Sequence, residues 1–375
     1  MRSLGHTALG TWSGGRFMHF GEPLDEPRLE ALLRPGGGIS TVITADAYGA
    51  GEADTVLGRS LQGLARSQYQ LVGAIGHDFY TGQRQGAKGF PRFTDPALRG
   101  AGEYAGYIRM AVERSLARIG VDAFDVLLLH NPDRTGYTDE RVWDGMAAVR
   151  EAGLAGALGV APGPANGFTL DLIDCLERFG DRIDWAMVIL NPLEPWPGEL
   201  VLDAARRHDV RLITRVVDYG GLFHDDVLPG HEFAPRDHRS FRPAGWVERG
   251  RERIERMRPI AERHGLTMLQ LACAWNLAHA PVACVAPTLI QEIGGRPVEA
   301  KRAELAALPA ASPLSDAEVA EIRAIGDNTG SMALKGAAPD FEGDPLPDRW
   351  PLSADLAALA GRWGIDPGRD LVQAV

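Results

Sequence analysis

The feature of this sequence that most limits its fold is a repeated alternation of short apolar runs with longer segments of helical spacing. Seven runs rich in β-branched residues have the length of strands, and several are apolar at almost every position, as strands covered on both faces are. Segments with apolar residues at three- and four-residue steps separate them. This order is typical of βα units around a parallel sheet. The expected strands are 41–44, 70–75, 124–129, 157–160, 185–190, 211–217 and 282–286.

The segments between the strands carry helix signals at both ends. Between residues 107 and 119, Ile108, Val112 and Leu116 recur at helical spacing, and Gly120 follows in the position of a C-cap. Ser315 and Glu318 have the spacing of a capping box, which predicts a helix after residue 315. The other expected helices are 140–152, 170–179, 246–264, 268–278 and 354–363.

About seven or eight such units favour a closed (β/α)8 TIM barrel over an open doubly wound sheet. Polar insertions at 78–99 and 224–245 interrupt the rhythm, and barrel enzymes use loops of this kind as lids. We therefore expect a barrel over residues 1–327. We expect a C-terminal extension over 328–375 that wraps the barrel, irregular from 328 to 349 because that stretch is rich in Gly, Pro and Asp.

Composition excludes several classes of partner. A formal net charge of −11 argues against a nucleic-acid surface, which needs clustered Lys and Arg, and favours a small-molecule substrate. The sequence contains no apolar run of the ~20 residues that span a bilayer, so we expect a cytoplasmic protein without membrane contact. No histidine or acidic motif has the spacing of a metal site, and the oligomeric state stays open. The three cysteines, Cys175, Cys273 and Cys284, lie in apolar stretches and are expected to be buried thiols.

Polar residues follow several of the expected strands at the carboxyl end, where barrel enzymes place their reactive groups. A tyrosine and a histidine that meet there can act as acid and base, since a phenol donates a proton and imidazole titrates near neutrality. Position alone leaves a structural alternative, in which the histidine caps a strand and the tyrosine packs beneath it. The candidates are Tyr48, His130, Asp46, His77, Arg215 and Asp218.

The run 38–49, continued at 57–61, resembles the first signature of the aldo-keto reductase superfamily. Stretches at 10–12, 107–130, 159–160 and 258–275 agree with the same family in order, so the resemblance covers roughly residues 4–325. It implies an NADPH-dependent carbonyl reductase with an Asp, Tyr, Lys, His tetrad. In that scheme the tyrosine protonates the carbonyl oxygen, Lys and Asp lower its pKa, and the histidine orients the substrate. The tyrosine falls on Tyr48 and the histidine on His130.

The other positions that the resemblance implies depart from the family pattern. The aspartate falls on Ile43 and the lysine on Ala74. Both members of the ion pair are therefore absent together, so that neither charge is left buried without its partner. The amide clasp of nicotinamide falls on Ala161, Pro162 and Met187, and the aromatic residue that stacks on its ring falls near Arg215.

A dinucleotide therefore has few expected contacts. If NADP or NAD binds, the resemblance leaves Gly10, Thr11, Thr288 and Arg296 as its contacts, with Lys301 or Arg302 as further phosphate candidates. In the second lid, His238 and Arg239 are candidates to meet the substrate, Arg239 by gripping an anion.

From these departures we interpret the chain as an enzyme that acts at a carbonyl or hydroxyl centre of a small polar substrate, such as an oxidised sugar, by acid/base chemistry without a cofactor. Elimination, dehydration and isomerisation are reactions of this kind. Tyr48 would polarise a substrate oxygen and His130 would move the proton, with Asp46, His77, Arg215 or Asp218 as a partner charge. Two alternatives stay open: an NAD(P)H-dependent carbonyl reductase or alcohol dehydrogenase, and a non-catalytic binding protein on the same scaffold.

Overall fold

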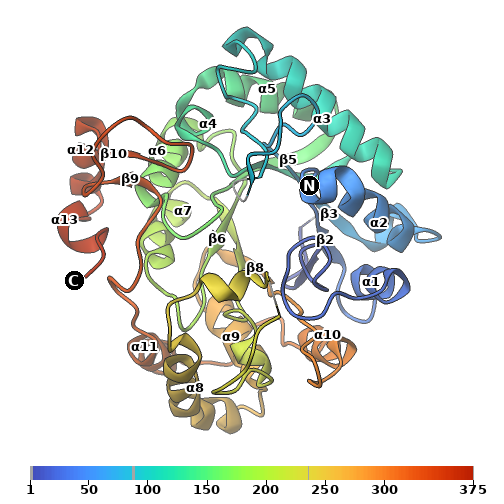
Figure 1. The fold of residues 1–375 in the computed structure, drawn as a ribbon, viewed down its shortest axis with the longest axis vertical. Helices are drawn as coiled ribbons and strands as arrows, with labels where there is room; N and C mark the ends of the chain where they lie inside the picture. Colours follow the sequence, from blue (N-terminus) through green and yellow to red (C-terminus); the bar gives the residue numbers. More distant parts are fainter. Residues whose placement is uncertain (1–2, 87–88, 235, 375) are drawn as a thin grey trace.

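The computed structural model describes residues 3–86, 89–234 and 236–374, and its centre is a ring of eight parallel strands. Each strand pairs with the next in chain order, so the sequence order and the order around the ring are the same. The helices lie outside this ring (Figure 1). The strands are β1 (Ala8–Gly10), β2 (Thr41–Ile43), β3 (Gln70–Ile75), β4 (Phe124–His130), β5 (Ala155–Ala161), β6 (Trp185–Ile189), β7 (Arg211–Arg215) and β8 (Val282–Ala286).

The ring is closed between its first and last strands. Thr7 forms a parallel bridge with Val285, and the Val285 N–H donates to the carbonyl of His6 at 2.9 Å. The expected TIM barrel is therefore confirmed, and the open sheet is not formed. β1 was absent from the expected strands because its sequence, Ala-Leu-Gly, has no β-branched residue to mark it, unlike the equally short β2, Thr-Val-Ile.

The helices follow the strands as βα units require. The expected Gly120 C-cap is present, with φ of 80° and its N–H donating to the Leu116 carbonyl. Ser315 and Glu318 form the expected capping box. No helix among the described residues is long and apolar enough to cross a membrane. The helices of the barrel region are α1 (Glu26–Leu33), α2 (Glu52–Leu61), α3 (Tyr104–Ile119), α4 (Arg134–Thr138), α5 (Glu140–Glu151), α6 (Thr169–Phe179), α7 (Leu202–Arg207), α8 (Trp246–Arg263), α9 (Met268–Leu277), α10 (Val298–Ala306) and α11 (Asp316–Ile325).

Two apolar clusters make up the core. The larger one lies between the strands and the surrounding helices, and the smaller one fills the barrel interior. Side chains alternate between them along each strand, so that Leu127 belongs to the outer cluster and Leu128 to the inner one. The three cysteines are buried and unpaired, as expected.

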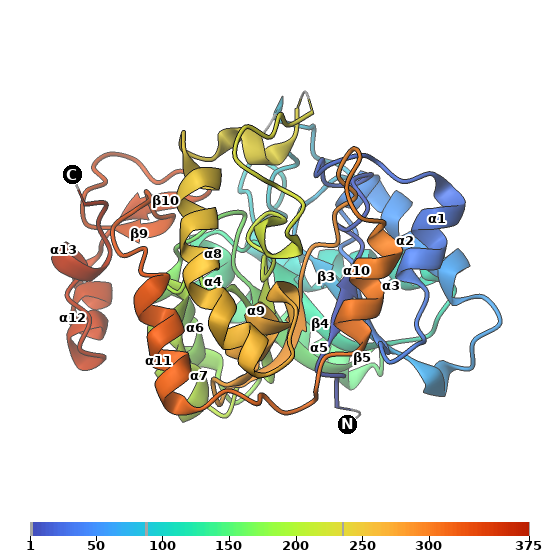
Figure 2. The same cartoon turned by 90° about the horizontal axis from the view of Figure 1, so that it is seen from below.

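The two polar insertions lie at the same end of the barrel, opposite the amino terminus (Figure 2). The first, 78–99, is tied at its base, where Asp78 N–H donates to the Pro91 carbonyl at 2.8 Å and Phe93 N–H to the Gly76 carbonyl at 3.0 Å. The second, 224–245, contains a short 3-10 turn, His238–Phe241. Residues 87, 88 and 235 of these insertions lie outside the described residues.

The C-terminal extension contains more regular structure than its composition predicts. Between residues 328 and 351, β9 (Gly336–Ala338) pairs in parallel with β10 (Arg349–Pro351), so the expectation of irregular chain up to residue 349 is wrong there. The expected helix is present as α12 (Ala354–Arg362), and a short α13 (Pro367–Asp370) follows it. Composition missed β9 because its pairing partner and its contact with α6 are both distant in sequence.

Candidate active site

Tyr48 and His130 meet at the carboxyl end of the barrel. His130 is the last residue of β4, two and four residues after the inward-facing Leu128 and Val126, so its side chain shares their direction. Tyr48 opens the short turn Tyr48–Gly51 after β2 and packs on the inner cluster. The two ring centres lie 5.7 Å apart with an interplanar angle of 88°. The structure thus brings together the pair of residues singled out in the sequence.

His77 is a third member of this group. Its ring centre lies 5.4 Å from that of His130. Its Nδ1 lies 2.7 Å from the Phe90 carbonyl oxygen and its Nε2 lies 3.1 Å from the Asn131 side-chain nitrogen. Since a carbonyl only accepts, Nδ1 carries the proton and Nε2 accepts from Asn131. Burial, reinforced by the positive charge of Arg92, lowers the pKa of His77 to about 3, so the ring is neutral at neutral pH.

Electrostatics fix the protonation states of the central pair. Burial lowers the pKa of His130 well below its usual value, and His77, Arg215 and Arg92 lower it further. Burial raises the pKa of Tyr48, and the charge of Arg215 opposes that rise. At neutral pH Tyr48 is therefore a phenol that can donate a hydrogen bond. His130 is a neutral imidazole whose buried Nδ1 has no hydrogen-bond partner among the described residues.

Arg215 brings a positive charge to the mouth, the carboxyl end of the barrel where Tyr48 and His130 meet. It comes from the far side of the ring of strands. It is the last residue of β7, four strands around the ring from β3, where the resemblance places the lysine. Its Nη2 donates to the Pro162 carbonyl at 3.0 Å, which holds the guanidinium over the end of β5. The charge acts on both Tyr48 and His130.

Apolar side chains stand at the positions to which the resemblance assigns the family's charged pair and two members of its amide clasp. Ile43, Ala74, Ala161 and Met187 are all buried in the inner cluster on which Tyr48 packs. None of these side chains offers a charge to the tyrosine. The floor of the mouth is consequently apolar.

The structure does not bring Asp46 into this group. Its carboxyl is fully buried, neither oxygen has a hydrogen-bond partner, and the charges that act on it belong to Asp54, Arg118 and Asp78. Arg118 of α3 binds Asp54 of α2, so Asp46 faces these helices rather than the mouth. Burial raises the pKa of Asp46 well above its usual value. The sequence interpretation erred because residues just after a short strand can turn outward.

Asp218 also has a different place from the one expected. Its carboxylate accepts the N–H of Thr288 at 2.6 Å and that of Gly221 at 2.8 Å, which joins the loops after β7 and β8. In TIM barrels these two loops frequently form a phosphate site. Here an internal carboxylate takes the backbone donors, and the Thr288 carbonyl is bonded to His224 at 2.9 Å.

The cations expected near a cofactor phosphate are all engaged elsewhere. Arg296 pairs with Glu304 and Asp226. Lys301 is fully buried and binds Asp226 and the Ile290 carbonyl. Arg302 donates to backbone carbonyls at 32, 34 and 36.

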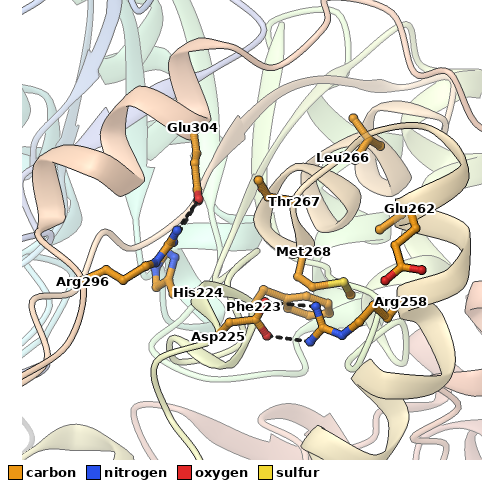
Figure 3. Close-up of a pocket in the computed structure, with 11 residues that line it drawn as sticks. Phe223, His224, Asp225, Arg258, Glu262, Leu266, Thr267, Met268, Arg296 and Glu304 are labelled. Carbon is orange, nitrogen blue, oxygen red and sulfur yellow. Dashed lines mark hydrogen bonds and ion pairs between the residues drawn. The ribbon is translucent and has the colours of Figure 1, made fainter.

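A cavity of about 200 Å³ lies beside Arg296, below the ~300–1,000 Å³ of typical ligand sites. Figure 3 shows two arginines at its edge, each tied to a carboxylate: Arg296 to Glu304 and Arg258 to Asp225. The cavity also touches His224, whose pKa burial lowers to about 3.

Gly10 and Thr11 serve the barrel rim. A Cβ on Gly10 would lie 2.2 Å from the Trp12 ring, and the buried Thr11 donates its N–H to the Ile43 carbonyl at 2.9 Å. Together with Ala161, Pro162, Thr288 and the engaged cations, these positions do not fit a dinucleotide held in the manner that the resemblance implies.

The two candidates of the second lid already have partners among the described residues. The guanidinium of Arg239 is almost completely buried and is bound by Asp237 and Glu292, so it has no free edge to grip a substrate anion. His238 packs against Phe20, with ring centres 5.4 Å apart. The expected anion-gripping role of Arg239 is therefore not supported.

Sequence reasoning missed Arg92 and Asn131. Asn131 follows His130 directly and has φ of 47°, a left-handed conformation that Asn tolerates better than most residues. Arg92 lies inside the first lid, where no local pattern marks it. Among the described residues, no group of three His, Cys, Asp or Glu side chains has an arrangement that could hold a metal ion.

Comparison with known proteins agrees with this architecture. Residues 8–327 match the sequence model of the Aldo/keto reductase family. A probable voltage-gated potassium channel subunit beta from Arabidopsis thaliana is 24% identical over 76% of this chain and 85% of its own. The 6-dehydroglucose reductase from Agrobacterium fabrum is 23% identical over 74% and 81%.

Two solved structures share the fold. The glycerol dehydrogenase from Gluconobacter oxydans has a TM-score of 0.66 at 22% identity, covering 91% of this chain and 96% of its own. An aldo/keto reductase from Klebsiella pneumoniae in complex with NADP and acetate has a TM-score of 0.57 at 20% identity, covering 86% and 92%. Because the family match spans the whole barrel and the (β/α)8 fold agrees with it, the chain belongs to the aldo/keto reductase family.

Proposed function

We propose that this enzyme interconverts a carbonyl and a hydroxyl group on a small polar substrate bound at the barrel mouth. The contact between Tyr48 and His130 carries the proposal, because it places a phenol donor beside a neutral imidazole at the carboxyl end of the barrel. Tyr48 donates a hydrogen bond to the reacting oxygen and gives that oxygen its proton as the hydroxyl forms, after which a solvent proton at the mouth restores the phenol; oxidation reverses these transfers. His130 accepts from a neighbouring substrate hydroxyl. Arg215 stabilises negative charge that develops on that oxygen.

The relatives support an oxidoreductase reaction with NADP or NAD. One relative is named a 6-dehydroglucose reductase, one structural neighbour is a glycerol dehydrogenase, and another was crystallised with NADP. Two of these names refer to polyhydroxylated compounds, which supports a sugar-like or polyol substrate. The dinucleotide would supply or accept the hydride. Since the positions that the resemblance assigns to it do not fit, this chain's residues are given only the binding and proton-transfer roles above.

A second candidate is cofactor-independent acid/base chemistry, such as elimination or isomerisation beside a carbonyl. The specific observation in its favour is the internal closure of the loops after β7 and β8 by Asp218. The apolar Ile43 and Ala74 under Tyr48 also favour it, because a tyrosine without a lysine neighbour stays a weak acid.

One experiment separates these functions. Purified protein is assayed on polyols and sugar carbonyls with NADPH or NADH, following the absorbance of the reduced nicotinamide. The same compounds are followed by NMR without dinucleotide. We expect dinucleotide-dependent turnover, with Tyr48→Phe lowering it about 10²- to 10⁴-fold.

Tyr69→Phe is the matched control, because Tyr69 is a buried tyrosine just before β3, at the opposite end of that strand from the mouth. If product forms without dinucleotide and no reduced nicotinamide is consumed or formed when dinucleotide is present, the second function replaces the first. Turnover that is unaffected by Tyr48→Phe would rule out both.

A further inference from the structure

Arg92 of the first lid holds two residues of the mouth. Its Nε donates to the Asn131 carbonyl, and its Nη1 lies 3.5 Å from Nδ1 of His77. Nδ1 already donates to the Phe90 carbonyl, so Arg92 acts on His77 as a neighbouring positive charge and not as a donor. Arg92 is only 7% exposed. Water therefore screens its charge little, and its position affects both Asn131 and His77.

The counter-charge of this buried arginine comes from the C-terminal extension. Nη2 of Arg92 donates to Oδ1 of Asp348, 256 residues further along the chain. A buried cation without a partner is costly, so the carboxylate fixes where the guanidinium can lie. The family match ends at residue 327, and Asp348 lies beyond it.

Asp348 is itself held in place by the docking of the extension. The Gly336 N–H donates to the Asp348 carbonyl at 2.9 Å, just before β10 begins. β9 and β10 are anchored on Asp171 of α6, which accepts the N–H of Ala337 at 3.0 Å and the indole N–H of Trp350 at 2.9 Å. Figure 1 shows the extension, in red, beside α6.

We propose that Asp348 is a positioning residue of the active site, which acts through Arg92 to hold His77 and Asn131 beside His130. The proposal rests on the mouth being the working site, but it concerns the extension and not the reaction. A planar guanidinium reaches the Asn131 carbonyl with one nitrogen and Asp348 with another. Without the carboxylate, Arg92 is free to leave the Asn131 carbonyl. Asn131 then no longer holds its side-chain amide against Nε2 of His77, the contact that with the Phe90 carbonyl selects one tautomer.

The test reads the histidine rings directly by NMR, with no substrate or cofactor. In the wild type we expect His77 to show one neutral tautomer protonated at Nδ1, identified by loss of its signals in His77→Gln. In Asp348→Asn we expect this single-tautomer signature to be lost and the His130 ring signals to shift. Arg92→Lys should give the same change, and the double variant no further change, because both substitutions break one path.

Asp340→Asn is the control, since Asp340 forms a more exposed ion pair with Arg349 in the same extension. It should leave the His77 and His130 signals unchanged. Asp348→Glu keeps the charge and should restore the wild-type signature, which also covers the case in which Asp348→Asn fails to fold.

Unchanged histidine signals in Asp348→Asn would overturn the proposal, as would an equal change in the control. Either result would leave the proposed carbonyl chemistry standing, because that chemistry is measured by turnover. Conversely, absence of turnover would not alter the histidine signatures.

Discussion

At the residue scale, the same side-chain types play different parts according to their surroundings. Tyr48 and His130 are neutral partners at the mouth because burial disfavours the charged form of each. Asp218 bridges the loops after β7 and β8, because its carboxylate accepts backbone N–H groups from both. Asp46, by contrast, is a buried acid with no hydrogen-bond partner.

Asp46 gives a prediction in which stability depends on pH. Its pKa is raised in the folded state, so the unfolded chain releases this proton at a lower pH, and wild-type stability falls as pH rises above about 4. Asp46→Asn cannot ionise, so we expect it to raise the free energy of unfolding at pH 7 by about 1–3 kcal/mol. The gain should vanish below about pH 4. Urea unfolding at a series of pH values measures both.

Asp54→Asn is the matched control for that substitution. Asp54 lies on the adjacent helix, and burial raises its pKa too, so its ionisation costs stability over the same pH range. It also accepts from Thr44, Ser115 and Arg118, and Asp54→Asn disturbs those bonds, so it should be destabilising below about pH 4, where Asp46→Asn has no effect. A loss of stability in Asp46→Asn at pH 7 would show that its carboxyl has a partner.

At the element scale, short signals in the sequence set the ends of helices accurately. Gly120 ends α3, and the Ser315–Glu318 box begins α11, each at the residue expected. These signals are reliable because a cap involves only neighbouring residues and its own backbone. β1 and β9, by contrast, are short and contain no β-branched residue, so nothing in their own sequence marks them as strands.

Two glycines of α3 provide a paired test of the cap. Gly120 has φ of 80°, and a Cβ there would meet no atom within 4 Å, so Gly120→Ala has only a backbone cost. We expect a loss of about 1 kcal/mol in unfolding free energy. Gly106→Ala, at an exposed position in the first turn of the same helix with equally free space, should gain up to about 1 kcal/mol. Equal effects of the two substitutions would contradict the cap assignment.

At the scale of the whole molecule, the C-terminal extension links distant parts of the barrel. It is anchored on α6 through Asp171, and Trp350 packs against the rings of Phe168 and Tyr137. From there it reaches the first lid through Asp348 and Arg92. The extension thus joins the outside of the barrel to the residues around His130.

The anchor itself can be tested through Trp350. Burial raises the pKa of Asp171 to about 6, and the indole donor partly offsets that rise. Trp350→Phe removes the donor, so the folded-state pKa should climb, and stability should go on falling above about pH 6, where that of the wild type levels off. We expect a loss of about 1–3 kcal/mol that is greater at pH 8 than at pH 5, measured by urea unfolding.

Trp363→Phe is the control within the same extension, because its indole binds Glu177, whose pKa is lowered and not raised. The effect of Trp363→Phe on the free energy of unfolding should depend on pH only in acid, below the usual pKa of Glu. A loss in Trp350→Phe that does not change with pH would mean that the indole N–H makes no contribution to the anchor.

The sequence by itself determined the barrel, the bounds of the helices that it predicted and the candidate pair of Tyr48 and His130, but it gave no sign of α1, α2, α7 and α10. Hydrophobic period, caps and strand-end position are local properties, and a parallel barrel brings the ends of its strands together without further information. The family resemblance placed the apolar Ile43 and Ala74 at the positions of the charged pair, and both belong to the inner cluster on which Tyr48 packs.

Only the tertiary structure decided which charged residues face the mouth. Asp46, Asp218 and Arg239 follow strands or lie in lids as candidates should, yet each is engaged or buried elsewhere. Arg92 and Asp348 are 256 residues apart, and no local pattern connects them. A side chain's ionisation and partners depend on what the rest of the fold packs against it, and that is set by contacts between segments far apart in the chain.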